Sequence, residues 1–170
     1  SIYIPAGVTL TIQNCTINMG RDKSIIVAPK GKLVVDNATI TNSCGYMWKG
    51  IEARGDITKA QYASNQSTVI IKNNSLIQYA QTAVTNWNAS GNDYSSSGGI
   101  IQVSNSTFNN NHIAASFAPY KGTYLGTKQR DFSYFTLDNF IIDNNYRDYN
   151  GAYPFLEHAA ILQDDGVTFS

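Results

Sequence analysis

Apolar and polar residues alternate in five short segments spread along the chain. In each segment, apolar residues stand two and four positions before an asparagine, as in a strand with one buried face. The five segments span residues 10–17, 33–40, 69–76, 101–108 and 135–142. Helical periodicity is absent from them. The pattern therefore predicts short β-strands that recur at one point of a repeat.

The anchoring asparagines set the size of that repeat, because they are 23, 36, 32 and 34 residues apart. These residues are Asn14, Asn37, Asn73, Asn105 and Asn139. A short constant motif separated by segments of variable length is typical of a solenoid that accepts insertions in single coils. An earlier apolar pair, Ile2 and Ile4, recurs as Ile25 and Val27 at the same 23-residue offset. Each coil therefore contains an early strand, a corner, a second strand, the asparagine turn and a third strand.

Three strands per coil predict an all-β fold, a right-handed parallel β-helix (solenoid) of about five to six coils. An antiparallel sandwich is the alternative, and it requires hairpin dipeptides such as Asn-Gly or Asp-Gly between paired strands. Such dipeptides are scarce, Asp165-Gly166 being one of them. We expect residues 1–170 to form a single β-helix segment, a piece of a longer chain whose neighbouring domains cover its ends.

The asparagines are expected to stack in register inside the turns. Each side-chain amide would bond to the turn of the next coil, and asparagine tolerates the backbone angles of a tight corner. Four of them begin Asn-x-Ser/Thr sequences, which we attribute to the repeat itself because an inward asparagine is no glycosylation acceptor. Asn65 and Asn88, in predicted loops, are better placed as acceptors.

Later coils carry insertions, roughly Arg54 to Ser67, Asn88 to Gly99 and Pro119 to Tyr134. Each follows the equivalent strand, so all three are expected at one corner of the coil, along one edge. Insertions gathered on one face of a solenoid often form its binding face. Flat amphipathic rings and cationic donors are the candidate ligand-binding residues. They are Tyr62, Tyr94, Tyr120, Lys121, Tyr124 and Arg130, with Lys128 among the donors. The alternative is that these loops only cover the end of the sheet.

Composition narrows the classes of partner. The chain is 42% hydrophobic and 14% charged, with a formal net charge of zero, which gives no electrostatic case for nucleic acid or an anionic membrane. The abundance of Asn, Ser, Thr, Gly and Tyr is common in extracellular β-rich proteins. No apolar stretch approaches the ~20 residues of a membrane-spanning helix. We therefore expect a secreted or cell-surface protein without membrane insertion.

Candidate chemistry is sparse. A glycan-cleaving β-helix needs a carboxylate pair for acid/base hydrolysis, or a basic residue near metal-binding carboxylates. Asp164-Asp165 resembles the paired aspartates of polygalacturonase-like hydrolases, but the Gly-His-Gly and Arg-x-Lys companions are missing. His112 and His158 stand far apart without metal-ligand spacing, so we expect no metal or cofactor. Arg54-Gly55-Asp56 spells an integrin-recognition tripeptide, which a glycine-requiring corner explains more simply.

Two cysteines and two tryptophans leave alternatives open. Cys15 and Cys44 are compatible with one disulfide or with small buried apolar residues, and Cys15 occupies the place that Ala38 takes one coil later. Trp48 is expected in the core at a coil corner. Trp87 borders an insertion, so it could pack in the core or serve as a platform for a ligand.

One part of the chain resembles a known family. The segments that show the resemblance are Ile4–Ile12, Pro29–Leu33, Ala38–Thr41 and Cys44–Ile51. The Cys-x-x-Met-Trp-x-Gly-Ile segment is the most specific of them. They resemble the β-helix regions of large secreted Bacteroidetes proteins, many of them exported by the type IX secretion system. The resemblance covers about the first third of the chain. It implies architecture and export, and it carries no catalytic residues.

These observations favour a non-catalytic extracellular scaffold, adhesin-like or glycan-binding through its inserted loops. Its partner would be a glycan or a host or cell-surface protein. One alternative is a polysaccharide lyase or glycoside hydrolase, which convergent carboxylates in a groove would favour. The other is a passive structural stalk, which well-packed loops without a concavity would favour.

Overall fold

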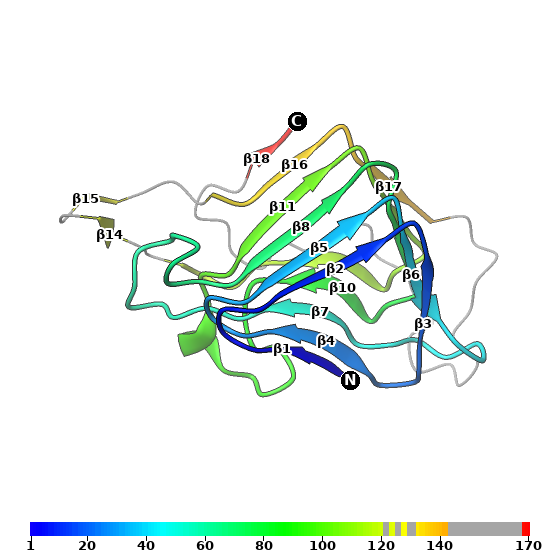
Figure 1. Cartoon of the computed structure of the whole chain (residues 1–170), viewed down its shortest axis with the longest axis horizontal. Coiled ribbons are helices and arrows are strands. Elements are labelled where there is room, and N and C mark those ends of the chain that lie inside the picture. Colours follow the sequence, from blue (N-terminus) through cyan, green and yellow to red (C-terminus); the bar gives the residue numbers. More distant parts are fainter. Residues whose placement is uncertain (121–122, 125–126, 129–131, 143–167) are drawn as a thin grey trace.

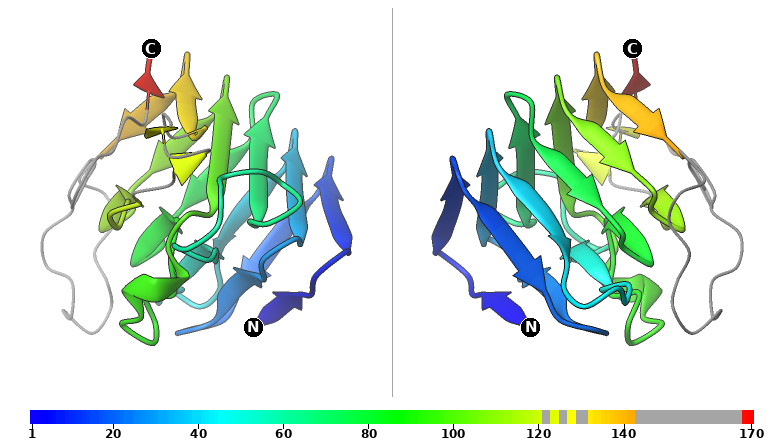
Figure 2. Two further views of the ribbon diagram at one scale, coloured as in Figure 1. Left: turned by 90° about the vertical axis from the view of Figure 1, so that its left-hand side faces the viewer. Right: turned by 90° about the vertical axis from the view of Figure 1, so that its right-hand side faces the viewer.

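The computed structural model describes residues 1–120, 123–124, 127–128, 132–142 and 168–170, and almost all of its regular structure is β-strand. Each turn of the chain adds one strand to each of three sheets (Figure 1). Pairing within these sheets is parallel, and the coils follow one another from the N-terminal to the C-terminal end (Figure 2). The molecule is a right-handed parallel β-helix, as the sequence predicts.

The three sheets form the three faces of the coil. The first sheet contains β1 (Ile2–Ile4), β4 (Ser24–Val27), β7 (Gly50–Ala53), β10 (Thr82–Thr85) and β13 (Ile113–Ser116). The second contains β2 (Thr9–Gln13), β5 (Lys32–Asp36), β8 (Thr68–Lys72), β11 (Ile100–Ser104), β16 (Tyr134–Thr136) and β18 (Thr168–Phe169). The third contains β3 (Thr16–Met19), β6 (Thr39–Asn42), β9 (Leu76–Gln78), β12 (Thr107–Asn109) and β17 (Asn139–Ile141).

The predicted alternation stacks equivalent apolar side chains inside the coil. In the second sheet, one register row runs through five coils and is buried throughout. Its members are Ile12, Val35, Ile71, Val103 and Phe135. Neighbouring strands lie about 4.8 Å apart, so each side chain packs on those above and below. Full burial of such a side chain contributes about 1.5–3 kcal/mol, and a shift by one residue would expose the whole row.

Aromatic rings replace the aliphatic stack toward the C-terminal end. Phe108 stacks on Phe140 with ring centroids 5.3 Å apart, and Phe135 stacks on Phe169 at 4.8 Å. Phe169 belongs to β18, which adds a strand of a sixth coil to the second sheet. The predicted number of coils, five to six, agrees with this arrangement.

The asparagine turns face solvent, so the predicted inward orientation is wrong, whereas the predicted amide bond between successive turns is confirmed for Asn14 and Asn37. Asn14, Asn37, Asn73 and Asn105 are exposed and have φ angles of 52°, 48°, 57° and 48°, the left-handed backbone that asparagine tolerates. Asn37 donates its amide to the Oδ1 atom of Asn14 at 2.8 Å. Asn73 instead donates to the Oδ1 atom of Asp36 at 2.7 Å. An outward turn forms because the inner space is filled by the apolar stack.

The fifth turn differs from the predicted alignment. Val103 pairs with Phe135, and Thr107 pairs with Asn139, so Asn139 stands at the start of β17 and outside the turn. Leu137 occupies the turn position with a φ of 56°. The hydrophobic row decided this register, because Phe135 fills the place of Val103 in the core. An asparagine two residues later could not compensate for an exposed phenylalanine.

Trp48 lies in the core as predicted, and its indole Nε1–H donates to the carbonyl of Gln78 at 2.9 Å. Both cysteines are free and exposed. The packing interpretation of Cys15 is therefore wrong, although Ala38 in the same position of the next coil is buried. The difference arises because β3, which follows Cys15, is the edge strand of its sheet.

The three insertions leave the coil at one corner, between the first and second sheets (Figure 1). They join β7 to β8, β10 to β11 and β13 to β16, and the predicted gathering on one edge is confirmed. We call them together the insertion layer, made of residues 54–67, 86–99 and the described residues between 117 and 133. The second insertion contains a short 3₁₀ helix, η1 (Tyr94–Ser96), and the third contains a small antiparallel pair, β14 (Thr123–Tyr124) and β15 (Thr127–Lys128).

Candidate ligand-binding site

Hydrogen bonds join the three insertions into one layer. The backbone N–H of Gly55 in the first insertion donates to the carbonyl of Ser96 in the second at 2.6 Å. The hydroxyl of Ser97 donates to the carbonyl of Pro119 in the third at 2.7 Å. Bonds between neighbouring insertions restrict their independent movement. Side chains carried by this layer therefore stand on a defined surface.

Two buried glutamines hold the first insertion in shape. The amide nitrogen of Gln66 donates to the carbonyls of Asp56 at 2.9 Å and Lys59 at 3.1 Å, and its oxygen accepts from the N–H of Asp56 at 2.7 Å. The oxygen of Gln61 accepts from the N–H of Phe132 at 2.6 Å. Buried amides with satisfied hydrogen bonds rigidify the backbone around them.

Tyr120 lies inside this layer and away from its surface. Its side chain is 3% exposed, and its hydroxyl donates to the carbonyl of Lys59. Its ring also lies against Gly98, where an added Cβ would come within 2.7 Å of a ring carbon. This burial removes Tyr120 from the predicted binding surface and makes it a support for the first and second insertions.

Tyr62 and Tyr94 keep exposed rings on the layer. Tyr62 is 39% exposed, and its ring centroid lies 6.1 Å from that of Phe132, which is also exposed. Tyr94 is 49% exposed and stacks on the buried ring of Trp87, with centroids 4.4 Å apart and an interplanar angle of 8°. Trp87 is therefore a buried support, and Tyr94 carries the exposed ring.

The other predicted ligand-binding residues lie largely outside the described residues. Lys121 and Arg130 belong to the third insertion but lie outside the described residues. Asp164, Asp165 and His158, farther along the chain, also lie outside them. Tyr124 and Lys128 belong to β14 and β15, where Tyr124 pairs with Thr127 and Lys128 with Thr123. The structure thus places the backbone of these two residues on the layer.

The Arg54-Gly55-Asp56 tripeptide has a structural explanation. The guanidinium of Arg54 pairs with Glu52, and a Cβ on Gly55 would lie 2.7 Å from the backbone nitrogen of Gly99. The Oδ1 atom of Asp56 accepts from the N–H of Thr58 at 2.9 Å and from its hydroxyl at 2.6 Å. These bonds lower the pKa of Asp56. Each member of the tripeptide therefore serves the corner that follows β7.

A pocket of about 310 Å³ opens on the outer face of the first sheet, and the sequence did not predict it. Its floor comes from β7 and β10 and the residues just before them, and its wall comes from the tip of the second insertion. The lining residues are Lys49, Glu52, Gln81, Thr82, Thr85, Ala89 and Ser90. A charged residue between apolar neighbours in β7, Glu52, was the one visible sign of it in the sequence.

Glu52 anchors the tip of the second insertion to the sheet through its bonds to Arg54 and Ser90. Its carboxylate is 4% exposed, and its Oε2 atom accepts from Nε and Nη2 of Arg54 at 2.9 and 2.6 Å. Its Oε1 atom accepts from the backbone N–H of Ser90 at 3.1 Å and from the Ser90 hydroxyl. Both oxygens are therefore occupied, as a buried carboxylate requires.

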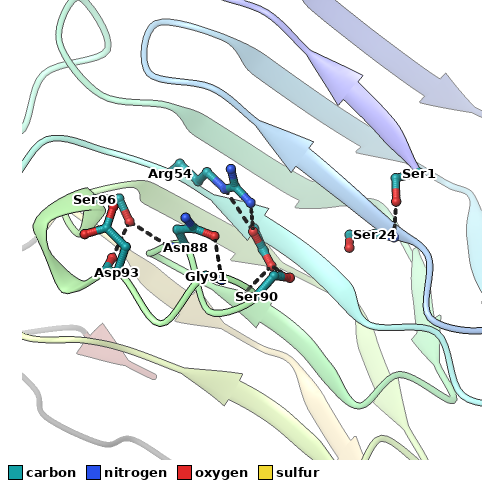
Figure 3. A network of polar contacts seen from close by, with 9 residues as sticks. Ser1, Ser24, Arg54, Asn88, Ser90, Gly91, Asp93 and Ser96 are labelled. Carbon is teal, nitrogen blue, oxygen red and sulfur yellow. Dashed lines mark hydrogen bonds and ion pairs between the residues drawn. The ribbon is translucent and has the colours of Figure 1, made fainter.

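Local bonds preorganise the tip (Figure 3). The N–H of Asn88 donates to the Ser96 hydroxyl at 2.7 Å, and the Asn88 side-chain oxygen accepts from Gly91 at 3.0 Å. Asp93 caps η1 by accepting from the N–H of Ser95 at 3.0 Å. Ser90 is thereby presented to Glu52 by a formed loop.

Within the described residues, Glu52 is the only carboxylate in the pocket lining, and no group of three His, Cys, Asp or Glu side chains is placed to hold a metal ion. The described part of the chain also contains no helix long and apolar enough to span a membrane.

Comparison with protein-family models, curated proteins and solved structures finds no match to this chain.

Proposed function

We propose that this chain is a non-catalytic, extracellular β-helix scaffold of a secreted or cell-surface protein that holds a glycan on its insertion layer. The stack of Tyr94 on Trp87 carries the proposal. A tyrosine ring that is half exposed and held flat by a buried indole offers a fixed apolar face with a polar rim. Sugar rings present apolar C–H faces that fit such a platform.

Tyr62 and Phe132 support the same function. They come from the first and third insertions, and both rings reach the surface of one layer. The buried glutamines and Tyr120 fix the backbone beneath them, so little order has to be gained on binding. Rigid aromatic side chains of this kind dominate the binding energy of many recognition surfaces.

The absence of a net charge is consistent with a ligand that binds through uncharged contacts. The formal net charge is zero, and serine and asparagine stand within three residues of Tyr62 and of Tyr94 in the sequence. Surfaces that combine tyrosine with serine, glycine and asparagine recognise ligands by stacking and adaptable hydrogen bonds. The same composition suits an extracellular protein, and export in the manner of the Bacteroidetes proteins that the first third resembles remains part of this proposal.

The test is binding to a panel of neutral and acidic polysaccharides, with mass spectrometry of both the retained material and its length. We expect retention of intact glycan, weakened about 5- to 30-fold by Tyr94→Ala or Tyr62→Ala, since a central aromatic contributes about 1–2 kcal/mol or more. Tyr3→Ala is the matched control, because Tyr3 is an exposed tyrosine on β1, outside the insertion layer.

Two outcomes would overturn the proposal. Shortened products would make the chain a lyase or hydrolase. Absence of retention across the panel would favour a structural stalk. Retention that the Tyr94 and Tyr62 variants leave unchanged would remove the aromatic rings from function and place the glycan elsewhere on the molecule. Thermal unfolding of each variant separates lost binding from lost folding.

A further inference from the structure

The pocket on the outer face of the first sheet is separate from the exposed rings of the insertion layer, and nothing in the glycan-holding function requires it. Glu52 and Thr85 pair across β7 and β10 and both point outward, away from the apolar interior. Ala89 and Ser90 close the pocket from the side of the second insertion. The chain thus builds a hollow with a mixed polar and apolar lining on an otherwise regular sheet face.

Among the residues that the structure describes, one positive charge in the pocket has no protein partner. Glu52 and Arg54 neutralise one another. The ammonium of Lys49 makes no hydrogen bond or ion pair to any other residue that the structure describes. The nearby carboxylate of Asp22 pairs with Arg21 at 3.3 Å and also accepts from Gln81.

Uncharged polar side chains line much of the rest of the pocket. Thr85 is 2% exposed, and its Oγ1 atom lies beneath the pocket floor, closed off from solvent and without a hydrogen-bond partner among the described residues. A buried polar atom without a partner is unfavourable and rare in folded proteins. The amide nitrogen of Gln81 donates to Asp22, which leaves the oxygen of Gln81 as an acceptor. Thr82 and Ser90 add hydroxyls to the lining.

We propose that this pocket binds one sugar-sized polyol that carries a carboxylate, such as a hexuronic acid. The volume of about 310 Å³ lies at the lower end for small-molecule sites and suits a single ring. Lys49 pairs with the ligand carboxylate in a charge-assisted hydrogen bond. Ligand hydroxyls bond to the side chains of Gln81 and Thr82.

Isothermal titration calorimetry of the whole chain with sodium glucuronate, glucose and sodium propionate tests the chemistry. We expect glucuronate to bind at least 10-fold more tightly than either control, because glucose lacks the charge and propionate lacks the hydroxyls. Polygalacturonate and free galacturonate distinguish a residue within a polymer from a free sugar acid as the source. Equal binding of glucose and glucuronate, or no heat with glucuronate at tens of millimolar, would refute the proposal.

Two variants locate the binding. Lys49→Gln should weaken glucuronate at least 10-fold, whereas Lys32→Gln, on the second sheet, should not. Thr82→Val should weaken glucuronate several-fold while the melting temperature changes little, because it replaces a lining hydroxyl with a methyl group. If Thr82 served structure alone, the variant would lose stability without a change in affinity. Unchanged affinity in Lys49→Gln would place the ligand elsewhere.

Failure here is distinguishable from failure of the insertion layer. Tyr94→Ala should leave glucuronate affinity unchanged, and Lys49→Gln should leave retention of neutral polysaccharide unchanged. Loss of glucuronate binding in Tyr94→Ala would show that the two surfaces form one site, which contradicts the separate pocket.

Discussion

Ser90 donates its backbone N–H, at 3.1 Å, and its hydroxyl to the same Oε1 atom of Glu52, a residue 38 positions earlier in the chain. This pair joins the tip of the second insertion to the outer face of β7. The opposite oxygen of Glu52 is held by Arg54. A single buried carboxylate therefore connects the corner after β7 with the loop after β10.

Ser90→Ala should loosen the tip of the second insertion. The variant loses one hydrogen bond to a charged group, worth about 1.5–3 kcal/mol, while the backbone N–H of residue 90 still donates to Glu52. Hydrogen exchange should become faster for amides of residues 88–93, with little change in the core strands. Ser64→Ala, in an exposed part of the first insertion, is the control. Unchanged exchange in residues 88–93 would show that the pair does not hold the loop.

Gly50→Ala should destabilise the fold by more than about 3 kcal/mol, because a Cβ there would overlap the carbonyl of Thr82 and the φ of +116° is strained for any side chain. Gly7→Ala is the matched control, since its φ is also positive, at +77°, but nothing lies within 4 Å of the added Cβ. It should cost only the left-handed penalty of about 1–2 kcal/mol. Urea unfolding measures both, and equal losses would contradict the packing argument.

Leu137→Asn should stabilise the protein, and Asn37→Leu should destabilise it. Both positions are exposed turns with left-handed backbone, which asparagine adopts more readily than leucine. We expect about 0.5–1 kcal/mol of gain at position 137. Asn37→Leu should lose about 1 kcal/mol or slightly more, since it also removes the bond to Asn14. A loss below about 0.5 kcal/mol, the usual range for surface substitutions, would show that these turns do not depend on asparagine.

Asp36 should make the fold sensitive to acid. The side-chain amide of Asn73, with a further contribution from Lys72, holds the pKa of Asp36 below its ordinary value of 3.8. A carboxylate with a lowered pKa in the folded state stabilises above its unfolded pKa, and that contribution disappears as the pH falls through the folded value. The difference in unfolding free energy between the parent chain and Asp36→Asn should shrink between pH 7 and about pH 2.5. An equal difference at both pH values would contradict this linkage.

Sequence reasoning succeeded where the information is periodic. The alternation around Leu33 and Val35 recurs in register with Leu10 and Ile12, and it is sufficient to predict strands, pairing and the corner at which the insertions leave. It failed at the fifth turn because it took Asn139 as the anchor. The core is filled by Phe135, and filling the core is worth more than placing an asparagine in an exposed turn.

The ligand surfaces depended on contacts between segments distant in sequence. Tyr62, Tyr94 and Tyr120 look alike in the sequence, and only the packing of one insertion on the next buries Tyr120 and exposes the other two. The pocket unites Lys49, Thr85 and Ser90 from three separate stretches of chain. The sequence by itself determined the β-helix, because a repeated apolar alternation has one way to bury its inner face. The tertiary structure decided which side chains meet a ligand, because exposure depends on how the inserted loops fold over the coil and over each other.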